Sequence, residues 1–202
     1  MLILGTGGLA LQLIDELENA YAEQLVFWND CGPEENSITQ KYRVLKNDAE
    51  VRNQFEQNGP GFIIAIGGVY HREKLLARFE SLGGSVKTFV AASARVSKYS
   101  TIGKGALIAT NAVIEAGVSV GTATLINTNA VLTHECTIGN YNEIAPMATF
   151  GGKAGTGDFV FVGLNATVLP KIRIGDHCTV GAGAVVIKDV ASHAKIKGVP
   201  AK

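Results

Sequence analysis

Apolar residues recur every six positions from Val90 to Ala191. When this stretch is divided into hexads beginning at Val90, the first position is Val, Ile or Leu in fifteen of seventeen hexads, and Phe150 and Thr156 are the exceptions. The second position is usually Gly, Ala, Ser or Glu, and the fifth is mostly small or β-branched. A fixed six-residue period over about a hundred residues is typical of a parallel β-helix. An ordinary sheet rich in Val and Ile does not keep one phase for so long.

The period predicts the geometry of the coils. Six extended residues span about 20 Å, so one hexad forms one side of a coil, and three sides close into a triangle. Stacked coils then pair residues eighteen apart in register. We expect the branched first residue to fill the interior, the small fifth residue to fit where the sides converge, and the small second residue to ease the chain through each corner.

The first eighty-odd residues follow a different pattern, in which short apolar strands alternate with amphipathic segments. We expect strands at Leu2–Leu4, Leu25–Trp28 and Phe62–Ile66. We expect helices from the glycine turn after Leu4 to about Ala22, around Ala49–Gln57, and from about His71 to Leu82. The stretch after Asp30 is predicted to be a loop, and Ser85–Phe89 a linker. Such alternation predicts a small parallel sheet with helices, hence a Rossmann-like α/β domain over residues 1–85 and an all-β parallel β-helix over 86–202.

Composition excludes several classes of function. Lys plus Arg equals Asp plus Glu, and there is no basic run, which argues against a nucleic-acid partner. No apolar run is long enough for a membrane span, and no secretory leader is expected. Cys136 and Cys178 fall at small fifth positions and are interpreted as packing residues; with Cys31 in a loop, they fit a reducing, cytoplasmic setting. We expect no metal, because no His, Cys and Asp residues have ligand spacing.

The glycine turn, residues 5–10 (GTGGLA), matches the dinucleotide pattern G-x-G-x-x-G/A, with Asp30 about twenty residues later. Gly7 and Gly8 allow a phosphate to approach a helix N-terminus. The domain has room for about one of the two halves that a dinucleotide needs, so a mononucleotide or a nucleotide-sugar diphosphate fits better than NAD. A plain tight turn is the alternative. Asn29, Asp30, Gly67 and Gly68 are expected at the carboxyl ends of strands, where ligands bind in such sheets.

His134 is the candidate for chemistry in the β-helix. It is third in the hexad LTHECT, with Glu135 beside it. A histidine can accept a proton at neutral pH, and a neighbouring carboxylate can orient its ring. The alternative is a solvated corner histidine, which is how His71, His177 and His193 are interpreted. No Ser stands in a nucleophile-elbow sequence.

These residues carry a family resemblance. The hexads, residues 127–139 (NTNAVLTHECTIG) and the tail 198–202 (GVPAK) resemble the left-handed β-helix, or hexapeptide-repeat, acyltransferases. The chain as a whole is similar to the branch that N-acetylates nucleotide-linked amino sugars, to which a sialic acid O-acetyltransferase is closely related. The resemblance implies a left-handed coil, a nucleotide-sugar domain at the N-terminus, acetyl-CoA as cosubstrate, and a homotrimer with active sites between subunits. It also implies a place in surface glycan (O-antigen) biosynthesis.

The resemblance also implies roles for residues. It makes His134 the general base, Glu135 its supporting carboxylate and Asn127 an active-site residue. Gly152 is placed where a backbone N–H meets the acetyl carbonyl. Coenzyme contacts fall to Glu143, Gly152, Leu164 and Gly181, and nucleotide-sugar contacts to Gly7, Gly8, Asn29, Asp30 and Gly67.

Two positions depart from the family pattern. Leu9 stands where members often have a histidine in the glycine turn, and Asn142-Glu143 stand where another histidine is common. The expected reaction is direct transfer of an acetyl group from acetyl-CoA to the amine of a nucleotide-linked 4-amino-4,6-dideoxy-type sugar. O-acetylation of a sialic acid-type sugar is the main alternative. A non-catalytic NAD(P)-binding protein and a β-helix scaffold are the others.

Overall fold

The computed structural model describes residues 1–21, 24–32 and 35–202. The chain forms two compact units, one made of Met1–Gly67 and His71–Lys87, the other of Gly68–Tyr70 and Thr88–Lys202. In the first unit, a parallel sheet has the strand order β3-β2-β1-β4-β5. Its strands are β1 (Leu2–Leu4), β2 (Val26–Trp28), β3 (Val44–Leu45), β4 (Gly61–Ile64) and β5 (Ser85–Val86). The helices are α1 (Gly8–Tyr21), α2 (Ser37–Lys41), α3 (Asp48–Asn58) and α4 (Val69–Ser81).

The expected strands and helices of this unit are present with small shifts of their ends, although the expected end of α1 near Ala22 lies outside the described residues. The buried face of α1 is apolar and includes Leu13 and Leu17, which are fully buried. Two predictions were wrong. The loop after Asp30 contains α2 and β3, which are too short for a periodic signal; α2 starts at a capping box made by Asn36 and Thr39. The linker near Ser85–Phe89 contains β5, which pairs with β4 as an edge strand.

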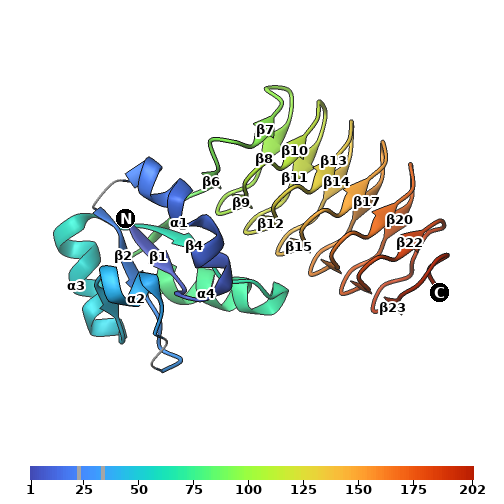
Figure 1. Cartoon of the computed structure of the whole chain (residues 1–202). Helices are drawn as coiled ribbons and strands as arrows, with labels where there is room; N and C mark the ends of the chain where they lie inside the picture. The colour runs from blue at the N-terminus through green and yellow to red at the C-terminus, as the bar shows by residue number, and fades with distance from the viewer. Residues whose placement is uncertain (22–23, 33–34) are drawn as a thin grey trace. The chain divides into compact units, whose positions relative to one another are not determined.

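The second unit is a left-handed parallel β-helix, which confirms the predicted fold. Its coils stack along one axis from β6 to β23 (Figure 1). Each strand has two residues. Residues eighteen apart pair, as Val113 does with Val131, except in the last coil, where Thr179 pairs with Lys195. The strands are β6 (Phe89–Val90), β7 (Arg95–Val96), β8 (Thr101–Ile102), β9 (Leu107–Ile108), β10 (Val113–Ile114), β11 (Ser119–Val120), β12 (Leu125–Ile126), β13 (Val131–Leu132), β14 (Thr137–Ile138), β15 (Glu143–Ile144), β16 (Thr149–Phe150), β17 (Gly155–Thr156), β18 (Phe161–Val162), β19 (Thr167–Val168), β20 (Arg173–Ile174), β21 (Thr179–Val180), β22 (Val185–Val186) and β23 (Lys195–Ile196).

The strands form three sheets, which we call the sides of the β-helix. Side 1 contains β6, β9, β12, β15, β18, β21 and β23; side 2 contains β7, β10, β13, β16, β19 and β22; side 3 contains β8, β11, β14, β17 and β20. Each strand joins the sixth position of one hexad to the first position of the next. Alternation along the strand explains the pattern: Ala112 and Ile114 point into the core, whereas Val113 between them is partly exposed.

The expected reason for small second-position residues was wrong. The left-handed backbone at the corners belongs to the fourth position, where Asn111, Glu135 and Lys153 have φ between 56° and 63°. Second-position glycines such as Gly103, Gly121 and Gly139 allow close packing between coils instead. A Cβ on Gly121 would lie 2.5 Å from the carbonyl carbon of Gly139 in the next coil, a distance at which the backbone has to shift.

Candidate active site

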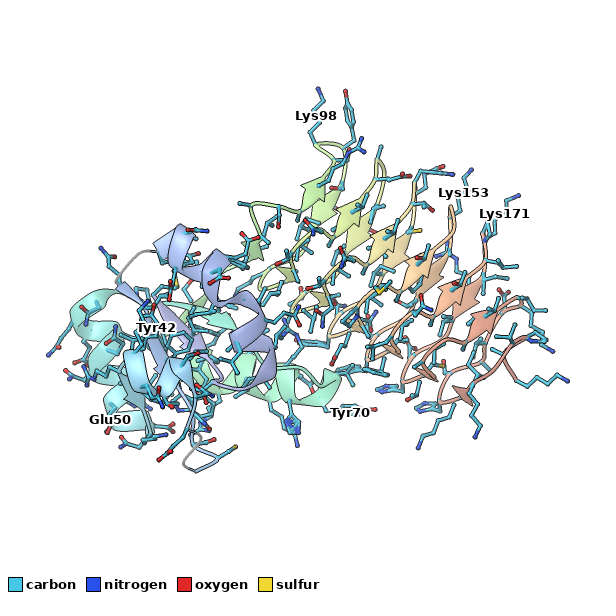
Figure 2. All side chains as sticks on the ribbon, in the orientation of Figure 1. Tyr42, Glu50, Tyr70, Lys98, Lys153 and Lys171 are labelled. Carbon is cyan, nitrogen blue, oxygen red and sulfur yellow. The ribbon has the colours of Figure 1, made fainter. Side chains whose placement is uncertain are left out.

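His134 lies at the corner between side 2 and side 3, directly after β13. The corner holds its backbone at both ends: the His134 N–H donates to Glu115 Oε2 at 2.9 Å, and its carbonyl accepts from the Lys153 N–H at 3.0 Å. Its side chain is 59% exposed. Figure 2 shows Lys153 and Lys171 extending outward from the same edge of the β-helix. The imidazole is therefore fixed at its base and open to a ligand.

Glu135 orients the ring. Its Oε2 lies 3.0 Å from His134 Nδ1, and Lys153 Nζ lies 3.6 Å from its Oε1. The hydrogen bond from His134, with the charge of Lys153, holds the pKa of the Glu135 carboxyl below its ordinary value. An ionised carboxylate only accepts hydrogen bonds, so Nδ1 carries the proton of the pair and Nε2 of the neutral ring holds a lone pair. This is the arrangement that a general base requires.

Gly152 lies against the imidazole from the next coil. A Cβ at this position would be 2.4 Å from both Cε1 and Nε2 of His134. Only a glycine leaves room here for the ring in this orientation. The backbone of Gly152 therefore approaches the nitrogen that accepts a proton, where a preorganised N–H donor can meet charge that develops during acyl transfer.

The other residues assigned to the β-helix lie elsewhere. Asn127, Leu164 and Gly181 all follow strands of side 1 and share the corner between sides 1 and 2. Asn127 is 7% exposed, with its Oδ1 accepting from the Thr128 N–H at 2.8 Å, whereas Leu164 is exposed. One six-residue side separates this corner from the His134 corner. A single chain therefore brings together His134, Glu135 and Gly152, but not Asn127, Leu164 and Gly181 with them.

Glu143 lies on side 1 itself, in β15. Its Oε2 accepts from the Gly68 N–H at 2.6 Å, so the carboxylate has a backbone partner within the chain. Its neighbour Asn142, the other residue at the family's histidine position, points inward and is fully buried. Asn142 and Glu143, which replace the family's histidine, therefore both have structural roles within the chain.

In the α/β unit, the predicted nucleotide-sugar residues gather at the carboxyl edge of the sheet. Gly7 lies between β1 and α1, Gly8 is the first residue of α1, Asn29 and Asp30 follow β2, and Gly67 follows β4. Asn29 Nδ2 donates to Thr6 Oγ1 at 2.7 Å, which ties the end of β2 to the glycine turn.

Sequence reasoning missed two partners at these sites. Asp30 forms an ion pair of 2.7 Å with Arg78 of α4, and this guanidinium also lies 5.0 Å from the centre of the Trp28 ring. Glu115 was also missed, although its spacing of nineteen residues from His134 puts it on the same corner in the preceding coil. The six-residue period therefore contained the information needed to place Glu115 beside His134.

No group of three His, Cys, Asp or Glu side chains that could hold a metal ion is found in residues 1–21, 24–32 and 35–202. Within the same ranges, no helix is long and apolar enough to cross a membrane.

A hexapeptide β-helix with a carboxylate-supported histidine beside a glycine backbone defines an acyltransferase. Comparison with known families agrees with this class. Residues 1–79 match the PglD N-terminal domain, and residues 100–134 and 150–188 match the hexapeptide repeat of succinyl-transferase. The chain belongs to the hexapeptide-repeat acyltransferases that carry a PglD-type N-terminal domain, which confirms the resemblance seen in the sequence. No curated protein matches the chain.

Solved structures show how far the likeness extends. A perosamine N-acetyltransferase from Caulobacter crescentus, in complex with CoA and GDP-perosamine, is 29% identical, with a TM-score of 0.91 over 100% of this chain and 94% of that one. The acetyltransferase domain of PglB from Neisseria gonorrhoeae is 24% identical, with a TM-score of 0.90 over 100% and 97%. WeeI from Acinetobacter baumannii is 23% identical, with a TM-score of 0.88 over 100% and 97%. The last two show the fold alone.

Proposed function

We propose that this acyltransferase moves an acetyl group from acetyl-CoA to the amine of a nucleotide-linked 4-amino-4,6-dideoxy-type sugar. The observation that carries the proposal is the His134 corner, where Glu135 holds Nδ1 and the Gly152 backbone lies against Nε2. The end-to-end similarity to an N-acetyltransferase in complex with CoA and GDP-perosamine supports this choice of substrates.

In the proposed mechanism, both substrates bind before transfer. The sugar amine attacks the thioester carbonyl while His134 Nε2 takes its proton, and Glu135 stabilises the imidazolium. The Gly152 N–H stabilises the negative charge on the carbonyl oxygen. The C–S bond then breaks, and His134 returns the proton to the departing thiolate. No covalent enzyme intermediate is required.

The proposed site residues are divided between two corners of the β-helix, and this division supports an oligomer. Asn127, Leu164 and Gly181 complete the proposed site only if they come from a neighbouring copy whose side 1–side 2 corner meets the His134 corner. A cyclic trimer provides this contact three times with one kind of interface. We therefore propose a homotrimer with coenzyme A bound between subunits, and nucleotide-sugar binding at the carboxyl edge of the α/β sheet. In this proposal the product enters surface glycan biosynthesis.

The first test is release of coenzyme A, followed with a thiol reagent, when acetyl-CoA is offered with UDP-, dTDP- and GDP-linked 4-amino sugars and with sialic acid. Turnover of one amino sugar, reduced in His134→Ala by about two to four decades, is the expected result. Near-normal turnover in that variant removes His134 from the role of base. Turnover with sialic acid alone would instead make the protein an O-acetyltransferase.

A further inference from the structure

A cavity of about 330 Å³ opens beside His134, on the side away from Gly152. Its lining includes Arg95, Ser97, Val113, Glu115, Ala116 and His134. The register Ile114↔Leu132↔Phe150 places the coil of Glu115 before that of His134 and the coil of Gly152 after it. The imidazole therefore has a glycine backbone on one side and a cavity on the other. If the thioester lies at Gly152, the cavity is the space left for the nucleophile.

Glu115 is the acidic group of this cavity, and it is exposed. Its Oε2 accepts from the His134 backbone N–H at 2.9 Å, which fixes the carboxylate next to the base. A carboxylate has two oxygens and about four acceptor positions, so one such bond leaves the group able to receive a ligand. The cavity also contains a cation, because Arg95 lines it from one coil further away.

This pair of charges suits one kind of ligand. A nucleotide-linked amino sugar carries an ammonium group on the ring and phosphate groups beyond its anomeric carbon. Arg95 and Val131 both pair with Val113, one on each side. Arg95 is therefore about 10 Å along the axis from the strand that precedes His134, since adjacent strands are ~4.8 Å apart. The backbone of Glu115 is thus one coil from that of the base and the backbone of Arg95 two coils from it, in the order of the charges on the ligand.

We infer that Glu115 binds the amino group of the acceptor as an ammonium ion and presents it to His134, which makes Glu115 the residue that selects an amine over a hydroxyl. The inference rests on the proposed function. The bound ammonium first releases a proton to water. The neutral amine then attacks, the N–C bond forms as the C–S bond breaks, and its second proton passes through His134 to the thiolate. Glu115 forms no covalent bond and loses no proton.

The test compares Glu115→Gln with the wild-type protein on two ligands: the amino sugar nucleotide that the wild type turns over, and the same nucleotide sugar with a hydroxyl in place of the amine. Glutamine keeps an oxygen that can accept the His134 N–H, but it removes the charge. The expected result is a rise of about tenfold or more in KM for the amine, the effect of losing a charged hydrogen-bond partner, with kcat within about threefold. Affinity for the hydroxyl analogue, measured by calorimetry, stays the same.

Glu73→Gln on α4 is the matched control, because it removes an exposed carboxylate outside the cavity, and it leaves KM unchanged. An unchanged KM for the amine in Glu115→Gln overturns the inference. Equal losses of affinity for both ligands, or a fall in kcat alone, overturn it too, because they show that Glu115 acts only on the backbone of His134. If the wild type neither binds nor turns over any amino sugar nucleotide, the proposed function fails first, and the inference fails with it.

Discussion

Asn142 Nδ2 lies 2.6 Å from Thr156 Oγ1 inside the β-helix, and these two residues break the apolar pattern at its fifth and first positions. Asn142 also donates to the Gly157 carbonyl at 2.8 Å and accepts from the Val160 N–H at 2.6 Å. Asn142 and Thr156 are thus partners in one buried hydrogen-bonded cluster. A buried polar group is tolerated when its hydrogen bonds are satisfied.

We therefore expect Thr156→Val and Asn142→Leu each to destabilise the chain by about 1–3 kcal/mol, because each leaves a buried partner unsatisfied. The double variant should lose less than the sum of the two, because the bond between Asn142 and Thr156 is lost only once, while the Gly157 carbonyl and the Val160 N–H lose Asn142 in both variants that lack it. Urea unfolding measures the free energies. Thr167→Val, at a partly exposed sixth position, is the control and should change little. Additive losses in the double variant would show that the pair is not coupled.

Gly152→Ala is expected to lower kcat by about tenfold to a hundredfold while the protein remains folded. The added Cβ would occupy the space of His134 Cε1 and Nε2, so the ring has to rotate away, and a small displacement of a catalytic group has an effect of this size. Coenzyme A release gives kcat, and circular dichroism checks the fold. In a His134→Ala background the same change should have no further effect; a further loss would show that Gly152 acts independently of the ring.

Glu135→Gln is expected to reduce kcat roughly tenfold, because the imidazolium loses a charged hydrogen-bond partner. The pKa of Glu135 in the folded chain is below its ordinary value of 4.5. Its contribution to stability is therefore complete above about pH 4.5 and is lost as the pH falls through the lower folded pKa. Urea midpoints of the wild type and Glu135→Gln should differ by a small constant amount from pH 8 to 5 and converge at lower pH. Convergence near neutral pH would contradict the ion pair.

Mixing two inactive variants tests whether the site is shared between subunits. His134→Ala and Asn127→Ala each disable one corner, so neither homo-oligomer should be active. When they are unfolded together and refolded at equal amounts, about one quarter of the sites in a cyclic assembly receive an intact His134 from one subunit and an intact Asn127 from its neighbour. Recovery of about that fraction of wild-type activity is expected. No recovery would place the whole site in one chain.

The three cysteines should differ sharply in reactivity. Cys31 is exposed, whereas Cys136 and Cys178 are buried, and burial raises the pKa of the Cys136 thiol. The thiolate is the reactive form, so we expect Ellman's reagent to titrate Cys31 alone in the native protein and all three thiols after unfolding. Cys31→Ser should remove the native reaction, which also makes it the suitable background for measuring coenzyme A release. Fast modification of more than one thiol would contradict the buried positions.

Much of the fold could be predicted from the sequence because the β-helix is built from short sequence repeats. Branched residues such as Ile114, Leu132 and Phe150 recur at one phase, and stacking makes every such residue a neighbour of the next at a spacing of eighteen. The strands and helices of the α/β unit could also be predicted where they are long enough to show a period. The candidates His134 and Glu135 came from one hexad, since neighbours in sequence share a corner.

Other features depend on contacts that a six-residue pattern does not contain. The sequence by itself determined the hexads, their coils and the residues that face the core, because burial of an apolar side chain is decided by local alternation. Only the tertiary structure decided that the ring of His134 lies against Gly152 and that the Glu115 carboxylate accepts the His134 backbone N–H. These contacts depend on how each side chain is turned toward the next coil. The physical reason is that packing between coils sets this orientation.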